Sequence, residues 1–160
     1  MDRRLGRALS LTFVLTVGCV LDAQGQGQGY AVAGPAGISG FFGSSASSVH
    51  IAGGGEALVG RLVGVGAEVG ALANSSNVLL VVSGNGMAHL SSGRFSPFVT
   101  AGYTRMQSGE GGFNAWNAGV GADYWVRDGV GIRFDFRDHV RPDSRGTVHY
   151  WTFRGGVVFR

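Results

Sequence analysis

The residues of this chain that could do chemistry are its four histidines, together with several serines and aspartates. Asp138 and His139 are adjacent, and Ser144 follows in the segment 141–146, so a serine nucleophile with His139 as its base is the best arrangement for hydrolysis. Ser92 is the other candidate nucleophile. Nothing in the spacing requires these residues to meet, and polar residues at a strand end normally lie at the water interface. We therefore predict that none is catalytic and that the protein is not an enzyme.

Metal and nucleotide sites have no better support. The chain has one cysteine, Cys19, and its histidines form neither an HxH nor an HExxH pattern. Glycine alternates with valine at 64–66 and 119–121. Alternation at period two is typical of a strand with one small-residue face, and not of a phosphate-binding loop. We predict no metal and no cofactor.

The composition indicates what kind of protein must position these residues. The chain has 160 residues, the length of one domain. Glycine contributes 30 residues, hydrophobic residues 44% and charged residues only 14%, a balance opposite to that of a disordered chain. Lysine is absent, and no arginine cluster after residue 7 suits a phosphate backbone. We therefore predict that the protein does not bind nucleic acid.

The first 23 residues are predicted to be a secretory signal peptide. Arginines at 3, 4 and 7 precede an apolar run from Ala8 to Leu21, and the small residue Ala23 ends the segment. The run is shorter than the roughly 20 residues of a transmembrane helix. Cleavage after Ala23 would leave a domain at 24–160 with ten arginines and eight acidic residues, a formal charge of +2. A lipoprotein signal at Cys19 is the alternative.

Beyond the leader, apolar residues alternate at period two, which predicts strands. From 130 to 137, apolar residues occupy the even positions, and glycine or charged residues the odd ones. The same alternation occurs at 63–71, 116–126 and 151–159. The first strand is the least regular, because Pro35 removes a backbone donor.

Turn-forming residues separate these segments at seven places, which predicts eight strands. The seven connections are Gly43–Ser48, Gly60–Arg61, Asn74–Asn77, Ser91–Arg94, Gln107–Gly112, Arg127–Gly129 and Arg141–Gly146. An even number of strands returns the chain to its starting side. Connections one, three, five and seven would then face outward from the cell, and three of them are among the longest, as in transmembrane barrels.

The two faces of the predicted strands suit a barrel in a membrane. One face carries aromatic and aliphatic residues for lipid. The other is mostly glycine with a few charged residues, which suits a narrow lumen filled by ion pairs. The charged set comprises Glu68, Asp123, Arg133, Asp135, Arg137 and Arg154. Glu56 is a further candidate on a poorly phased strand. Because an eight-stranded barrel leaves room only for side chains, we favour a plugged lumen over a narrow pore.

Aromatic residues near the strand ends could form girdles at the two membrane interfaces. The candidates are Tyr103, Trp116, Tyr124, Trp125 and Trp151.

The register can be predicted at the hairpin around residues 127–129. A strict two-residue turn at 128–129 would place Asp123 opposite Phe134 and mix the polar and apolar faces. A three-residue turn at 127–129 places Asp123 opposite Arg133, where opposite charges attract across the strands. We predict that pairing.

The chain as a whole resembles the small eight-stranded outer-membrane β-barrels of diderm bacteria, of which the transmembrane domain of OmpA is the familiar example. The resemblance covers most of 30–160 and is most specific in the closing strand. That strand carries Trp151, Phe153, Val157 and Phe159 in phase, followed by one extra residue, Arg160. In the family, such a strand is recognised by the barrel assembly machinery.

The resemblance and the residues together imply an all-β, eight-stranded, antiparallel, up-and-down transmembrane barrel in the outer membrane. Its expected partners are outer-membrane lipid and, during biogenesis, the assembly machinery, and its expected state is a monomer. We predict a non-enzymatic, structural role in the envelope. The alternatives are a small-solute porin-like channel, a barrel enzyme that modifies lipid A, and a soluble secreted β-sandwich.

Overall fold

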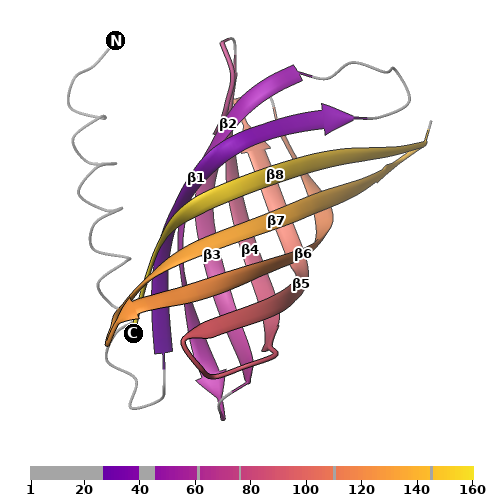
Figure 1. Cartoon of the computed structure of the whole chain (residues 1–160). Coiled ribbons are helices and arrows are strands. Elements are labelled where there is room, and N and C mark those ends of the chain that lie inside the picture. The colour runs from indigo at the N-terminus through magenta and orange to yellow at the C-terminus, as the bar shows by residue number, and fades with distance from the viewer. Residues whose placement is uncertain (1–26, 40–45, 61, 76, 110, 145) are drawn as a thin grey trace, which may run out of the picture.

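The computed structural model describes residues 27–39, 46–60, 62–75, 77–109, 111–144 and 146–160. Eight antiparallel strands pair in sequence order, and β8 pairs with β1 to close a barrel (Figure 1). The strands are β1 Gly27–Ser39, β2 Ala46–Val59, β3 Val63–Ala73, β4 Val78–His89, β5 Phe95–Ser108, β6 Gly111–Arg127, β7 Val130–Asp143 and β8 Gly146–Phe159. The predicted all-β, up-and-down architecture is confirmed, whereas the predicted signal peptide at 1–23 lies outside the described residues.

Within the described ranges, no helix is long and apolar enough to cross a membrane.

We call the two ends of the barrel the terminal end and the loop end. At the terminal end, β1 begins, β8 ends, and short turns join β2 to β3, β4 to β5 and β6 to β7. At the loop end, opposite to it, β1, β3, β5 and β7 end and β2, β4, β6 and β8 begin. Turns at 60–62 and 74–77 confirm two predicted connections, and Gly60 has a φ of 78°, a conformation that glycine adopts without strain.

The connections predicted at 107–112 and 141–146 lie where predicted but are shorter than predicted. The ladder between β5 and β6 continues to Ser108 opposite Gly111, and that between β7 and β8 continues to Asp143 opposite Gly146. Most of 107–112 and 141–146 is therefore strand. Their polarity favours a loop, but the residues on both sides of 109–110 and 144–145 pair as strand.

Pro35 lies inside β1 and does not end it. Its missing N–H falls on the β8 side, where the ladder has no partners for residues 34 and 35 but is paired on both flanks at Ala33–Gly155 and Ala36–Thr152. The strand therefore tolerates the proline at the cost of a short gap in one ladder.

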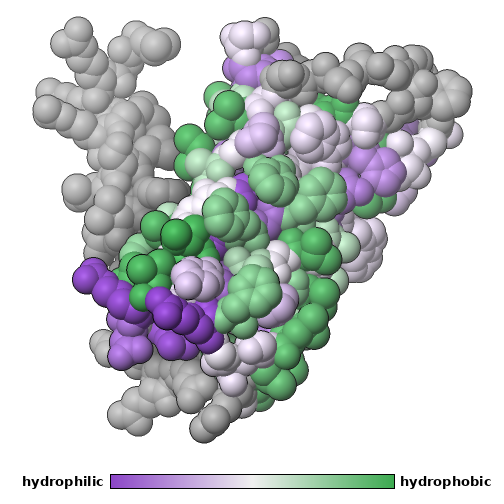
Figure 2. Space-filling model, viewed as in Figure 1, coloured by the Kyte–Doolittle hydropathy of each residue, from purple (hydrophilic) through white to green (hydrophobic). Residues whose placement is uncertain are grey.

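Alternation along the strands produces an apolar exterior (Figure 2). Valine, isoleucine, leucine and phenylalanine side chains point outward and are exposed, for example Ile51, Val65 and Phe134 at 62%, 59% and 55%. The charged residues at alternate positions are buried inside. Such a surface is unsuited to water and suits hydrocarbon.

Four of the five predicted girdle residues face outward: Tyr103, Trp116 and Tyr124 are exposed, and Trp151 is partly exposed. Trp125 is not a girdle residue. It shares the inward phase of Asp123 and is only 6% exposed, so it closes the lumen near the terminal end.

Candidate functional site

The lumen is the candidate site because the charged side chains of the strands converge in it. Arg133 and Arg137 lie on β7 and Arg154 on β8, all fully buried. Successive side chains of a strand point to opposite faces, so residues an even number of positions apart, such as Arg133 and Arg137, share the inward face. Four carboxylates, Glu56, Glu68, Asp123 and Asp135, are buried with them. All six residues predicted for the charged set therefore lie in the lumen.

Arg133 forms an ion pair in the half of the lumen toward the terminal end. Its Nε and Nη2 donate to the two carboxylate oxygens of Asp123 over 2.7 and 2.8 Å. The predicted register, with Asp123 opposite Arg133, is confirmed. Arg127 in fact pairs with Val130 across a two-residue turn, and a bulge between Trp125 and Arg127 supplies the extra residue.

Aromatic rings enclose the same guanidinium. The Arg133 Cζ atom lies 4.3 Å from the ring centre of Tyr30 and 4.7 Å from that of Phe98. Both rings point into the lumen. Two cation–π contacts and a two-point ion pair fix this side chain across the lumen.

Arg154 connects β8 to both sides of the lumen. Its Nε and Nη2 donate to Asp135 over 2.7 and 2.8 Å, and its Nη1 donates to Glu68 on β3 over 2.7 Å. Nη1 also lies 3.3 Å from Nδ1 of His50. Because Arg154 lies on β8 and Glu68 on β3, this contact joins two strands that are not neighbours in the barrel.

Arg137 is bound less completely. Its Nη1 lies 3.3 Å from Glu68, and its Nη2 lies 3.9 Å from Asp135. Its Nε and Nη2 make no hydrogen bond within the described structure, and neither does Nε2 of His139. Buried polar groups of this kind are normally satisfied by internal water.

Glu56, the further candidate named from the sequence, joins the network, and several polar residues that the sequence did not predict complete it. Glu56 binds Nε2 of His89 at 2.9 Å and accepts a hydrogen bond of 2.8 Å from Gln28. The Tyr30 hydroxyl donates to Glu68 over 3.0 Å. On the other wall, Asn117 donates to Asn85 and Thr104. The phase of Glu68, carried across the turn at Gly60, was the available signal for Glu56.

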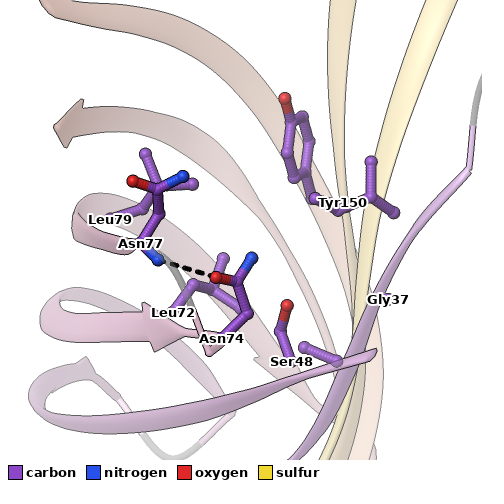
Figure 3. A pocket seen from close by; sticks show the side chains of 9 residues that line it. Gly37, Ser48, Leu72, Asn74, Asn77, Leu79 and Tyr150 are labelled. Atoms are coloured by element: carbon purple, nitrogen blue, oxygen red, sulfur yellow. Dashed lines mark hydrogen bonds between the residues drawn. The ribbon is translucent and has the colours of Figure 1, made fainter. Parts of the chain in front are cut away.

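The loop end of the lumen is apolar. Leu72, Val81, Met106 and Tyr150 form a buried cluster above the ion pairs. A small pocket opens beside it, with Leu72, Leu79 and Tyr150 around it and a turn at its rim in which the Asn77 N–H donates to Asn74 Oδ1 over 2.7 Å (Figure 3). The charged middle of the lumen is thus separated from the loop end by apolar side chains.

The structure does not assemble the candidate hydrolase. His139 points into the lumen, is fully buried and contacts the carbonyl oxygen of Tyr150 through Nδ1 at 3.2 Å. Asp138 points outward and binds Nδ1 of His149 at 2.7 Å. Ser144 donates to Asp143 at the loop end, whereas Ser92 is in the β4–β5 turn at the terminal end.

No serine hydroxyl in the described part of the chain hydrogen-bonds to His139 or His149. Among the same residues, no group of three or more histidine, cysteine, aspartate or glutamate side chains could hold a metal ion.

Solved structures with the same architecture are small membrane barrels. Neisserial surface protein A matches with a TM-score of 0.67 and 15% identity over 83% of this chain and 96% of that chain. The N-terminal β-barrel domain of Pseudomonas aeruginosa OprF matches with a TM-score of 0.61 and 17% identity over 84% and 98%. The outer membrane protein OprG from Pseudomonas aeruginosa matches with 0.58 and 10% over 86% and 98%.

This is the fold of the small eight-stranded outer-membrane β-barrels. The resemblance noted in the sequence is therefore confirmed for the fold. No protein-family model matches the chain, and no curated protein matches it significantly. Identities of 10–17% relate this barrel to the others by architecture. What it does must be argued from its own residues.

Proposed function

We propose that the chain is an outer-membrane protein with a structural role in the envelope, that it catalyses nothing, and that its lumen is plugged. The observation that carries the proposal is the ion-pair network across the lumen. Arg133, Arg137 and Arg154 are fully buried and each faces a carboxylate on another strand. A solute would have to displace these pairs, and eight strands leave little space beside them.

The apolar exterior supports membrane insertion. Only closed barrels and helices satisfy every backbone group in hydrocarbon, and this barrel closes by pairing β8 with β1. The outer face carries exposed phenylalanine, tyrosine and aliphatic side chains along the length of the strands, and Tyr124 lies near a strand end. A protein of this kind needs no second subunit to bury its surface, so we propose a monomer surrounded by lipid.

The closing strand supports assembly by the outer-membrane machinery. Trp151, Phe153, Val157 and Phe159 share the outward face of β8, and the last three are at least 41% exposed. The strand is also the one that must meet β1 to complete the barrel. We therefore propose that the assembly machinery recognises these four side chains.

The first experiment is outer-membrane fractionation of cells expressing the chain, with gels run on boiled and unboiled samples. We expect a membrane-bound species whose mobility changes on boiling, as folded barrels show. Recovery in the soluble periplasmic fraction without a mobility change would contradict the proposal and return attention to a secreted sandwich.

The second experiment separates a plug from a pore. Purified protein in planar bilayers is expected to give no steady conductance. Arg137→Gln, which removes the least completely bound lumen cation, is expected to increase it, and Arg105→Gln on the outer surface serves as the control. Steady conductance of the unaltered protein, changed by Arg137→Gln and not by Arg105→Gln, would establish the channel alternative.

A further inference from the structure

The arginines of the described residues differ in what neutralises them. In the lumen, each arginine faces carboxylates. At the loop end, Arg141 pairs with Asp143 at 3.4 Å, and Arg105 hydrogen-bonds to Asn114 at 3.1 Å. Like the guanidinium group of Arg105, those of Arg94, Arg127 and Arg160 have no carboxylate of the described chain within 4.0 Å.

Arg105 lies alone at the loop end, whereas the other three, Arg94, Arg127 and Arg160, gather at the β6–β7 turn at the terminal end. The Arg94 side chain donates to the carbonyl oxygens of Trp125 and Val126 over 3.0 and 3.3 Å. Arg127 ends β6, and the backbone N–H of Arg160 donates to Gly129 over 3.1 Å. Figure 2 shows a strongly hydrophilic patch at this end of the barrel, next to the apolar band.

Aromatic rings hold two of the guanidinium groups in place. Arg94 Cζ lies 5.4 Å from the ring centre of the outward-facing Tyr124, and Arg160 Cζ lies 4.2 Å from that of Trp125, which closes the lumen at this end. Tyr124 is 45% exposed and sits opposite Phe95 at the edge of the apolar band. An arginine beside an interfacial tyrosine lies at the depth of lipid headgroups.

We propose that Arg94, Arg127 and Arg160 form a binding site for the phosphate of an anionic phospholipid in the leaflet at the terminal end. Guanidinium groups match phosphate oxygens in geometry and charge, and binding supplies the anion that the protein does not. Asp128, at the tip of the turn, is the one acidic side chain on the described part of this rim, and it leaves an excess of positive charge. The inference rests on the proposed membrane insertion.

The chemistry favours phosphatidylglycerol over phosphatidylcholine. Both lipids carry a phosphate. In phosphatidylcholine the choline ammonium neutralises the headgroup, and it would be repelled by the same arginines. Attraction near a membrane surface is electrostatic and weakens with salt. The preference should therefore decrease as salt rises.

The test uses the refolded chain in vesicles of phosphatidylcholine containing one-fifth phosphatidylglycerol, extracted into mild detergent and analysed for the lipids that remain bound. We expect at least threefold enrichment of phosphatidylglycerol over its share in the vesicles, falling to no enrichment in Arg127→Gln/Arg160→Gln. Arg105→Gln, at the opposite end, should retain the enrichment. The double variant keeps Arg94, which also fastens the turn, so its barrel should fold.

A heat-modifiable band for each protein shows insertion and is scored separately. If the unaltered chain inserts but shows no enrichment, or if the double variant keeps full enrichment, the lipid site is wrong and the proposed function stands. If the chain does not insert, the proposed function itself fails.

Discussion

Strands β1–β4 and strands β5–β8 form two unlike halves of one barrel. In β5–β8 the outward face carries phenylalanine, tyrosine and tryptophan, whereas in the described parts of β1–β4 the single such ring, Tyr30, points inward. The outward face of β1–β4 is instead glycine, alanine, valine and other aliphatics. The outward faces of both halves are apolar, but only that of β5–β8 carries aromatic rings, which prefer the membrane interface.

The lumen shows the same division by charge. All three buried arginines belong to β7 and β8, and two of their four carboxylates, Glu56 and Glu68, belong to β2 and β3. The charged contacts between the halves therefore run across the lumen, chiefly through Glu68. Arg133–Asp123 and Arg154–Asp135 join neighbouring strands, whereas the contacts of Glu68 with Arg137 and Arg154 join strands that are not neighbours in the barrel.

Removal of Arg154 should have the largest effect on this connection. Arg154→Met keeps much of the side-chain volume but leaves Asp135 and Glu68 buried without their shortest contacts. We expect a loss of about 3–5 kcal/mol in the free energy of unfolding. Urea titration of the barrel refolded in bilayers, followed by gel mobility, measures it.

The control for this prediction is Arg105→Met on the outer surface, expected to change stability by less than about 0.5 kcal/mol. A loss below about 1 kcal/mol for Arg154→Met would mean that the halves are held by strand pairing alone.

The two outer faces should respond alike to charge if both meet lipid. Ala67 lies midway along β3, and Phe136 midway along β7, and both are exposed. Arginine at either position should cost about 2–4 kcal/mol near the centre of the bilayer. The same unfolding titration tests both variants. A cost at Phe136 but none at Ala67 would show that the small-residue half does not face hydrocarbon.

Glycines mark a smaller difference between the inside and the outside. A Cβ on Gly121, in β6, would lie 2.5 Å from Cζ of Phe98 and 2.6 Å from the carbonyl oxygen of Phe134, whereas one on Gly84, on the outer face of β4, would meet nothing within 4 Å. Gly121→Ala should destabilise by about 1–3 kcal/mol. Gly84→Ala should stabilise by about 0.4–1 kcal/mol. Equal effects in the unfolding assay would contradict the tight lumen.

The unlike halves also explain what the sequence could predict. Strict alternation and mixed charges in β7 made its inward residues and its pairing with β6 predictable, down to Asp123 opposite Arg133. In β2, a run of glycines around 53–55 carries no polar–apolar contrast, so the sequence does not define on which face Glu56 lies. The contacts of Arg137 and Arg154 with Glu68 could not be predicted, because they depend on distances across the lumen.

Two predictions differ from the structure near the ends of the strands. Trp125 was assigned to a girdle by residue type, although its position shares the phase of Asp123 and a bulge follows it. The segments 107–112 and 141–146 were assigned to loops by polarity, although their residues continue the ladders. At the ends of a barrel, strands extend beyond the membrane into water, and polarity no longer distinguishes strand from loop.

The smallest expected difference lies in one pair of side chains from each half. Tyr103 and Trp116 face each other across β5 and β6 with ring centres 5.1 Å apart at 74°, while Val69 and Val82 are partners across β3 and β4. Double-mutant cycles to alanine should give a coupling of about 0.5–1.5 kcal/mol for the aromatic pair and about 0.2–0.5 kcal/mol for the valines. Unfolding titrations in bilayers supply both cycles. Because the edge-to-face geometry adds an attraction that aliphatic contact lacks, equal couplings would mean that the rings act only through the area they bury. The aromatic half would then differ from the other in size of side chain and not in kind of interaction.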